Sequence, residues 1–273
     1  LVQSLQGHLS DAIESLDTLL LHDPAHDRAR LEKLRLMSEI CDWGEHDLYN
    51  DLPADFGAHG EALSPFPFLA LEDSPGQQLR RSQAYAKRFE PTHPVAVGPV
   101  AAKAEKKIRV GYFSADFHNH ATMHLMGGLF ENHDRDAFEI FAYSFGPDKS
   151  DRERHRTKSH VDAFRDVHQC TSAEISAQAR QDALDIAIDL KGYTGESRPE
   201  IFANRVAPIQ IAWLGYPGSL GTSHIDYAIV DNVVVPPEHR ASFTENLIFM
   251  PDSYQINDQT RSIADQPFSR ADC

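Results

Sequence analysis

The sequence has 273 residues, of which 41 % are hydrophobic and 25 % charged, and its formal net charge is −15. This composition is that of a globular protein with one large or two smaller domains; the acidic balance argues against a nucleic-acid binder, and no stretch approaches the ~20 apolar residues of a membrane span. The three cysteines are widely spaced and form no CxxC pair, which argues against a zinc ribbon and fits a reducing compartment. We therefore expect a cytoplasmic protein without nucleic-acid or membrane partners.

The first segment of the chain, residues 1–40, is predicted to be helical. Apolar residues recur there at three- and four-residue spacing, which marks one face of an α-helix: Leu5, Leu9, Ile13, Leu16 and Leu20. The pair Asp23-Pro24 is expected to end this helix, and a second amphipathic stretch follows between Leu31 and Ile40. The segment is therefore predicted to be a pair of helices.

The first of these helices resembles the second helix of a tetratricopeptide repeat, with Gly7, Ala12, Leu16 and Pro24 at the corresponding places. In such a repeat, small residues allow paired helices to pack closely, and a proline closes the unit. An isolated helical hairpin fits the pattern almost as well. If the repeat is real, further units are expected upstream, because one repeat cannot bury its own faces.

Residues 41–106 are predicted to be a helical and loop connector. Three prolines interrupt its middle: Pro65, Pro67 and Pro75. Residues 76–89 are predicted to form one more helix after this loop. Residues 95–107 combine prolines with charged side chains, which is typical of a linker that enters a new domain.

From residue 107 onward, apolar strands alternate with helices. The predicted strands are residues 107–113, 138–145, 184–190, 209–214, 226–230 and 246–250. The predicted helices are residues 120–132, 151–164 and 173–183. Strands that recur every ~20–30 residues with helices between them indicate βαβ units and a parallel sheet. We therefore predict an α/β fold with a Rossmann-like lobe over residues 107–255, followed by the start of a linker over residues 256–273.

Three loops of this lobe are the candidate binding region. In an open parallel sheet, ligands bind beyond the carboxyl ends of the strands, which selects residues 114–120, 191–198 and 215–221. All three loops are rich in glycine, polar or titratable residues and could approach one ligand closely. Neither a GxGxxG fingerprint nor a Walker loop occurs, so the lobe is not expected to bind a dinucleotide by itself.

The first of these loops and the helix after it carry three histidines, His118, His120 and His124, close to Asp116. Three interpretations remain open from the spacing alone. One histidine at a helix N-terminus could contact phosphate or act as an acid or base. His120 and His124, at i and i+4 on one helix face, could bind a metal with Asp116 or His118, although no HExxH motif is present. Alternatively, the histidines are structural and hydrogen-bond to loop carbonyls.

Several blocks of the sequence carry specific motifs. The stretch VGYFSADFHNHATMHLM occupies Val110–Met126. Three more motifs follow within residues 191–231: RxAPxQ at Arg205–Gln210, WLGYPG at Trp213–Gly218 and HIDY at His224–Tyr227. Cys41-Asp42-Trp43 is a further short motif upstream. Together they resemble the protein O-GlcNAc transferase family, including its SPINDLY-like and bacterial members, and the resemblance covers the chain from residue 41 to its end.

This resemblance implies a GT-B architecture of two Rossmann-like lobes, and transfer of a sugar from a nucleotide donor to Ser or Thr hydroxyls of proteins without a metal or other cofactor. It places His120 in the catalytic position that faces the donor sugar and diphosphate, where a histidine has been proposed as a base. It also implies substrate-binding roles for further residues: Asp116, Asp189, Gly192, Tyr193, Thr194, Leu214, Gly215 and Pro217. Among these, Leu214, Gly215 and Pro217 correspond to the loop that lines the sugar pocket.

The resemblance implies that this sequence corresponds to only the N-terminal lobe of such an enzyme. The residues that bind the uridine and a lysine that stabilises the leaving group are expected in a second, C-terminal lobe. The chain is therefore expected to be inactive alone, to need that lobe and acceptor proteins as partners, and to use UDP-GlcNAc as donor substrate. A non-catalytic protein-binding module is the alternative function, and a metal-dependent hydrolase built on the histidines is a third; the oligomeric state is left open.

Overall fold

The computed structural model of the protein describes residues 2–44, 52–53, 55–60, 62–91, 107–262 and 269–270. Its helices are α1 (Val2–Leu5), α2 (Leu9–His22), α3 (Asp27–Glu39), α5 (Pro75–Ala86), α6 (Ala121–Asn132), α7 (Arg152–Ser159), α8 (Ser172–Gln181) and α9 (Pro199–Ala203), with 3-10 turns η1 (Phe66–Ala70), η2 (Lys87–Phe89) and η3 (Pro237–Ser242). Its strands are β1 (Ile108–Ser114), β2 (Phe138–Ser144), β3 (Ala163–Asp166), β4 (Ile186–Asp189), β5 (Ile209–Ala212), β6 (Tyr227–Val230) and β7 (Asn246–Phe249). No helix in this part of the chain is long and apolar enough to cross a membrane.

Within the described residues, the strands form one sheet in which every pair is parallel, in the order β3-β2-β1-β4-β5-β6-β7. In the register, Val110 of β1 lies between Ile140 of β2 and Ile186 of β4. The strand order reverses at β1 and β4, and this reversal is the switch point beyond which such sheets bind ligands. The topology confirms the predicted Rossmann-like lobe.

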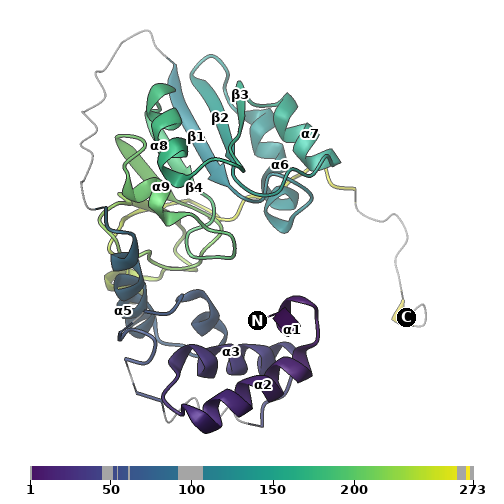
Figure 1. Cartoon of the computed structure of the whole chain (residues 1–273). Coiled ribbons are helices and arrows are strands. Elements are labelled where there is room, and N and C mark those ends of the chain that lie inside the picture. The colour runs from purple at the N-terminus through teal and green to yellow at the C-terminus, as the bar shows by residue number, and fades with distance from the viewer. Residues whose placement is uncertain are drawn as a thin grey trace.

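Helices cover both faces of the sheet, and alternate residues of each strand point to opposite cores. On one face, Phe113 and Tyr143 pack with Phe202 of α9 and with α8. On the other face, Tyr112 packs with Met126 of α6. Figure 1 shows α8 and α9 on one side of the sheet and α6 and α7 on the other. The strands read as nearly continuous apolar runs because they are buried on both faces.

The predicted helix over residues 151–164 is wrong in its second half. Helix α7 ends at Ser159, and residues 163–166 form the edge strand β3, which pairs with β2. This strand is short and no residue in it is fully buried, so it lacks the apolar run that marked the other strands. Its Arg165 pairs instead with Asp182, just after α8. Pairing with β2 therefore decided the local structure, as is common for edge strands.

The front segment consists of the packed helices α2 and α3, with the short α1 before them. Helix α2 ends at His22, directly before the predicted stop at Asp23-Pro24. Ala12 of α2 is buried, and α3 contributes buried leucines, including Leu34 and Leu36. A pair of packed helices fits both a repeat unit and an isolated hairpin, so the tetratricopeptide assignment stays a prediction.

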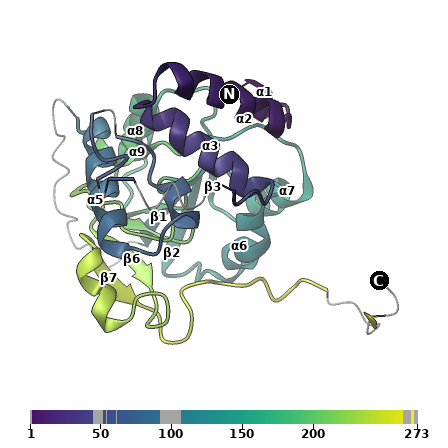
Figure 2. The same ribbon diagram turned by 90° about the horizontal axis from the view of Figure 1, so that it is seen from below.

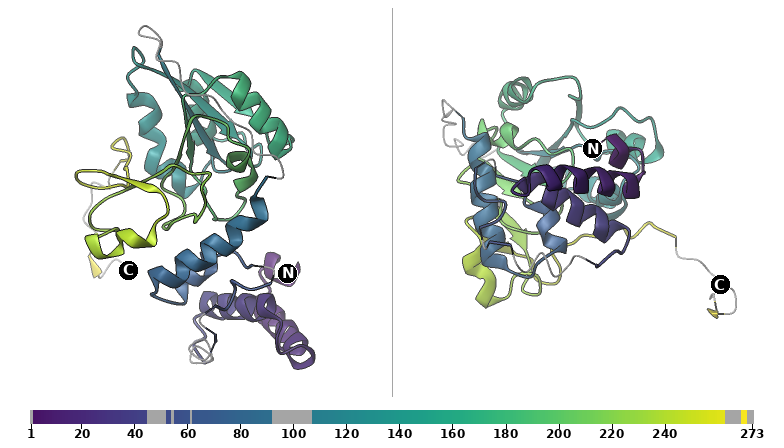
Figure 3. Two further views of the ribbon diagram at one scale, coloured as in Figure 1. Left: turned by 90° about the vertical axis from the view of Figure 1, so that its left-hand side faces the viewer. Right: turned by 60° about the horizontal axis from the view of Figure 1, so that its bottom comes forward.

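Helix α5 lies between the front helices and the lobe (Figure 3). Nε2 of Gln78 donates to the hydroxyl of Tyr216 at 2.6 Å and to the carbonyl of Pro65 at 2.8 Å. The ring of Tyr85 packs edge-on against Tyr193, with centroids 5.0 Å apart. Tyr193 and Tyr216 both belong to candidate loops of the lobe, so α5 packs against these loops and supports them. Residues 92–106, with most of the predicted linker, lie outside the described residues, and the predicted domain boundaries stay predictions.

After β7 the chain returns across the lobe toward α6 and α7 as a C-terminal strap, residues 250–262 (Figure 2). Nε1 of Trp213 donates to the carbonyl of Tyr254 at 2.9 Å. Further along, the carboxylate of Asp258 is paired with Arg156 of α7. The first part of the predicted linker is therefore packed on the lobe.

Candidate functional site

The three loops selected from the sequence follow neighbouring strands. In the register, Asp189 at the end of β4 lies beside Phe113 of β1 on one side and beside Ala212 of β5 on the other. Because the strands are parallel, the loops after β1, β4 and β5 all start at the same edge of the sheet. The candidate site is therefore built at the switch point and on its β5 side.

A buried ion pair joins the loops after β1 and β4. Nζ of Lys191 lies 2.9 Å from each carboxylate oxygen of Asp116. Only 7 % of the lysine side chain and 5 % of the aspartate side chain are exposed. Buried charges need partners for every polar atom, and Oδ2 of Asp116 also accepts the hydroxyl of Thr122 at 3.2 Å. The pair thus fixes the two loops relative to each other.

His120 is the N-cap residue of α6. Its Nδ1 accepts the backbone N–H of Thr122 at 3.2 Å, which satisfies one of the free donors at the start of the helix. The same nitrogen lies 3.1 Å from Oγ1 of Thr122 and 3.5 Å from Oδ2 of Asp116. The side chain is 41 % exposed, and Nε2 has no hydrogen-bond partner among the described residues. The outer edge of the ring is therefore open to a ligand.

Several groups act on the protonation of His120. Burial lowers the pKa of its ring below the usual value, the Asp116 carboxylate raises this pKa, and the Lys191 ammonium lowers it. Smaller contributions come from His118, which lowers the pKa, and Glu196, which raises it. The net direction is downward, so the ring is neutral at pH 7.

His118 is packed inside the loop after β1. It is buried, its Nδ1 lies 3.2 Å from the carbonyl oxygen of Asn119, and its ring packs edge-on against His120. The backbone N–H of Asn119 donates to Asp151, the N-cap of α7, at 2.8 Å. The metal interpretation gains no support, because no group of three or more His, Cys, Asp and Glu side chains is placed to hold a metal ion in the described ranges.

Asp189 orders the loop after β4. Its Oδ1 accepts the backbone N–H groups of Lys191 at 2.9 Å and Gly192 at 3.1 Å. Gly192 has φ +56°, and a Cβ there would lie 2.5 Å from Cβ of Tyr216, so only glycine fits. Oγ1 of Thr194 donates to the carbonyl of Lys191 at 2.9 Å and closes the turn. Burial raises the pKa of Asp189, against the opposite effect of the two N–H groups.

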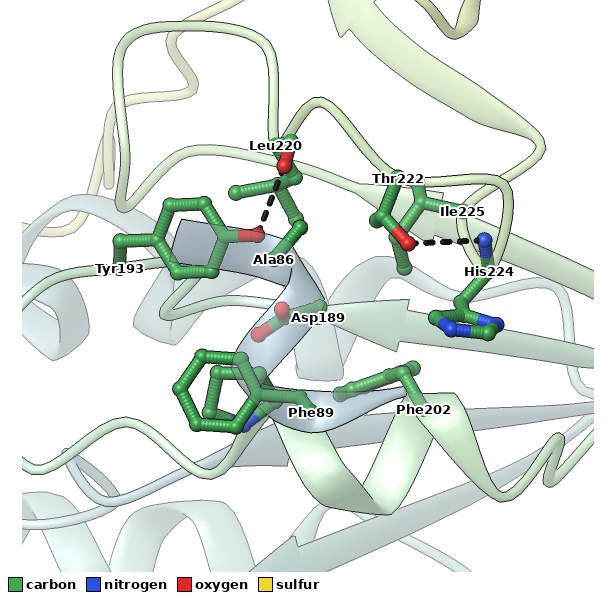
Figure 4. A pocket seen from close by; sticks show the side chains of 10 residues that line it. Ala86, Phe89, Asp189, Tyr193, Phe202, Leu220, Thr222, His224 and Ile225 are labelled. Carbon is green, nitrogen blue, oxygen red and sulfur yellow. Dashed lines mark hydrogen bonds between the residues drawn. The ribbon is translucent and has the colours of Figure 1, made fainter. Parts of the chain in front are cut away.

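Asp189 and Tyr193 line a small cavity beneath this loop (Figure 4). The cavity lies between the loop, α9 and the end of α5. Its walls are mostly apolar and include Phe89 and Phe202, and His224 is one of its polar residues. Neither Asp116 nor His120 belongs to this lining. The structure therefore separates two of the predicted substrate-binding residues from the His120 side of the site.

The loop after β5 positions its predicted residues through the backbone. Leu214 has φ 73°, a left-handed conformation that residues other than glycine rarely adopt and that proteins often retain at functional sites. A Cβ on Gly215 would overlap the carbonyl oxygen of Leu190. Leu214 and Pro217 line an apolar pocket together with Trp213. The loop can therefore line this pocket only while its backbone keeps this conformation.

The predicted residues thus fall into three groups: Asp116 with His120, the loop ordered by Asp189, and the pocket beside β5. The sequence analysis missed Lys191, which joins the first two groups, and Thr122, which stands between Asp116 and His120. The signal for Lys191 was its place directly after a buried strand, next to the strand that precedes Asp116. The substrate-binding roles themselves stay predictions.

Comparison with known proteins identifies the family. Residues 92–266 match the family described as glycosyl transferase family 41. This match covers more than half of the chain. The chain belongs to glycosyl transferase family 41. The matched range contains the whole sheet and all three loops of the candidate site, so the family assignment applies to the lobe that carries the site.

Relatives from plants and animals are similar to this family 41 chain. It is 37 % identical over 210 residues to the "Probable UDP-N-acetylglucosamine–peptide N-acetylglucosaminyltransferase SEC" of Arabidopsis thaliana, which covers 76 % of this chain and 21 % of that protein. It is 37 % identical over 159 residues to the UDP-N-acetylglucosamine–peptide N-acetylglucosaminyltransferase of Caenorhabditis elegans, covering 58 % of this chain and 14 % of that protein. The SPINDLY protein of Petunia hybrida is 30 % identical over 153 residues, covering 55 % of this chain and 16 % of SPINDLY.

The fold is similar to that of a solved structure, a variant of the O-GlcNAc transferase of Thermobaculum terrenum. The TM-score is 0.73 at 26 % identity, and the match covers 90 % of this chain and 48 % of that one. The family 41 chain thus spans about half of the solved structure and between 14 % and 21 % of the three relatives. These findings confirm the resemblance to the O-GlcNAc transferase family.

Proposed function

We propose that the chain is the N-terminal lobe of a protein O-GlcNAc transferase, which moves N-acetylglucosamine from UDP-GlcNAc to Ser or Thr hydroxyls of acceptor proteins. Membership of family 41 supports glycosyl transfer, and the relatives compared above are UDP-N-acetylglucosamine–peptide transferases by name. The observation that carries the proposal is the position of His120, which caps α6 with an open ring edge beside the Asp116–Lys191 pair at the switch point.

The geometry suits the electrostatic demands of this reaction. Inverting transfer needs the acceptor hydroxyl in line with the anomeric carbon, and it needs the charge of the departing diphosphate stabilised. The open edge of His120 and the positive end of the α6 dipole lie together and can contact the donor. Gly192 and Gly215 let backbone amides approach sugar hydroxyls closely. The remaining stabilisation and the uridine site belong to a second lobe in this proposal.

The proposed reaction uses the nucleotide sugar as a substrate and no metal or other cofactor. Acceptor proteins and the second lobe are the proposed partners. We place the enzyme in the cytoplasm, because the widely spaced cysteines fit a reducing compartment.

Ligand-induced thermal stabilisation tests the two-lobe arrangement. The chain and a protein that carries both lobes are each unfolded with UDP-GlcNAc, UDP and GDP-fucose at millimolar concentration. A ligand at 100 times its Kd stabilises the folded state by about 2.7 kcal/mol. UDP ligands are expected to stabilise only the two-lobe protein, and GDP-fucose neither protein. Stabilisation of the single lobe by UDP would contradict the placement of the nucleotide site in the second lobe.

A single-turnover transfer assay tests the activity itself. Protein-linked N-acetylglucosamine is expected from the two-lobe protein with UDP-GlcNAc and an acceptor, and none from this chain alone. Sugar transferred by the single lobe would overturn the expected inactivity. A two-lobe protein that transfers no sugar to protein from any nucleotide donor would overturn the proposed function.

The non-catalytic module is not favoured. The family match spans the lobe with all three loops, and the strained Leu214 and the tight Gly192 and Gly215 are costly features that a simple docking surface does not need. If a two-lobe protein binds acceptor proteins without a donor and transfers no sugar to them, the non-catalytic module would be favoured.

A further inference from the structure

Lys191 is a buried lysine at the switch point that neither the motifs nor the proposed chemistry uses. It donates to both oxygens of Asp116, and both side chains are almost fully buried. The net stabilisation from a buried ion pair is small, because the loss of hydration opposes the attraction between the charges. The pair is therefore expected to act mainly through its effect on the neighbouring side chains.

The cap of α6 favours one of the two positions for the proton on the neutral His120 ring. Nδ1 accepts the N–H of Thr122, so Nδ1 must have a free lone pair. In the neutral ring the proton is then on Nε2, at the open edge. The ring therefore presents a hydrogen-bond donor to a ligand, whereas a base at this position would need an unprotonated Nε2. Protonation of Nδ1 would remove the cap from the helix.

Asp116 alone would favour the opposite arrangement. Its Oδ2 lies 3.5 Å from Nδ1 of His120, and an unbalanced carboxylate at that distance attracts a proton to this nitrogen. The hydroxyl of Thr122 stands between them, 3.2 Å from Oδ2 and 3.1 Å from Nδ1. Lys191 balances the charge of Asp116 and binds both of its oxygens, so Nδ1 stays free to cap α6.

We propose that Lys191 is a positioning residue of the transferase: by pairing with Asp116, it keeps His120 neutral, with Nε2–H at the open edge as a donor to the nucleotide sugar. The identity of that ligand rests on the proposed function, but the coupling of Lys191 to His120 is a property of the chain itself. The other groups that face His120 are His118, which also opposes its protonation, and Asp116 and Glu196, which favour it.

Nitrogen NMR of the 273-residue chain with isotope-labelled histidine tests the coupling. The chain has 15 histidines, and His120→Asn identifies the signals of His120 by their loss. In the wild type, the neutral ring should have a protonated Nε2 and a bare Nδ1. In Lys191→Met, the titration should move to higher pH, and a measurable fraction of neutral rings should carry the proton on Nδ1, because the charge that opposes both changes is gone. Lys191→Arg keeps a cation with paired donors and should restore the wild-type behaviour.

If His120 keeps its wild-type tautomer and titration in Lys191→Met and only the melting temperature falls, Lys191 is merely structural. This result would overturn the proposal. If methionine prevents folding, Lys191→Gln removes the charge but keeps one N–H donor for Asp116. The same shift to higher pH is then expected, and an unchanged titration again overturns the proposal.

Activity separates this inference from the proposed function. Protonation of Nδ1 removes the α6 cap that holds the ring in place, so kcat in a protein with both lobes is expected to fall as His120 becomes protonated. This acidic limb of the pH profile should move to higher pH in Lys191→Met, by the same amount as the NMR titration of His120. If the Lys191→Met enzyme is active and neither its acidic limb nor the titration of His120 has moved, the proposed role of Lys191 is rejected and the proposed function is not. Wild-type two-lobe protein that transfers no sugar rejects the proposed function, while the NMR result for Lys191 still stands.

Discussion

The loops after β1 and β5 both carry residues predicted to contact the donor sugar, yet they are held in place differently. After β1, side chains hold the site: Lys191 binds Asp116, and His120 caps α6. After β5, the backbone holds it: Leu214 is in a left-handed conformation, and Gly215 packs directly against the carbonyl of Leu190. A change of side-chain chemistry should therefore alter protonation in the first loop, whereas an added methyl group should displace the chain in the second.

The largest effect is expected for Gly215→Ala. The new Cβ overlaps the carbonyl oxygen of Leu190, which is backbone and cannot rotate away, so the loop must move. A cost of about 1–3 kcal/mol in the free energy of unfolding is expected, as for other overpacked sites. Chemical denaturation measures it. Gly195→Ala is the matched control, because a Cβ there meets nothing within 4 Å. Equal stability of the two variants would contradict the backbone account of this loop.

The next largest effect on stability is expected for His120→Ala, which removes the cap of α6. Loss of an N-cap costs about 1 kcal/mol. His120→Asn supplies a good capping side chain without an imidazole, so it should recover most of that stability. In a two-lobe protein, both variants should lose transfer by about 100-fold or more. Full activity in His120→Asn would show that the residue serves only as a cap.

A similar or smaller effect is expected for Tyr216→Phe, which tests how α5 supports the loop after β5. The lost hydroxyl is 2.6 Å from Nε2 of Gln78 and 3.2 Å from Oγ of Ser82. Loss of such a buried bond costs about 0.5–1.5 kcal/mol, although Gln78 keeps its bond to Pro65. Thermal unfolding measures the change. Tyr85→Phe is the control, because it removes a hydroxyl for which the described residues offer no hydrogen bond; if it costs as much, the support from α5 does not depend on the Tyr216 hydroxyl.

The last variant, Asp189→Asn, changes the geometry of the side chain least. The sign of its effect on the melting temperature depends on pH. The pKa of Asp189 is raised above its ordinary value of 3.8 by burial. Its contribution to folding is therefore full below pH 3.8 and is lost as the pH rises through the folded pKa. Asparagine keeps an oxygen for the N–H groups of Lys191 and Gly192 and carries no charge. The melting temperature of the variant relative to the wild type should therefore rise as the pH increases above 3.8. A difference that does not change with pH would show that Asp189 is not desolvated in the folded chain.

Much of the lobe could be predicted because its strands are buried on both faces and leave apolar runs in the sequence. The helix stop at Asp23-Pro24 could be predicted for a similarly local reason. Strand β3 could not, since its four residues are partly polar and become a strand only by pairing with β2. The short α9 was missed as well, because a helix of five residues has no periodicity to detect.

The site shows the same division between local and distant information. The sequence alone determined the family, through motifs such as WLGYPG, and it determined which loops meet, because parallel strands end at one edge of the sheet. Only the tertiary structure decided that Lys191 pairs with Asp116 across 75 positions of sequence, that Asp189 faces a separate cavity, and that His120 caps a helix with its Nδ1. The physical reason is that a charge or a ring nitrogen acquires its role from the atoms within a few ångströms of it, and folding brings those atoms from distant parts of the chain.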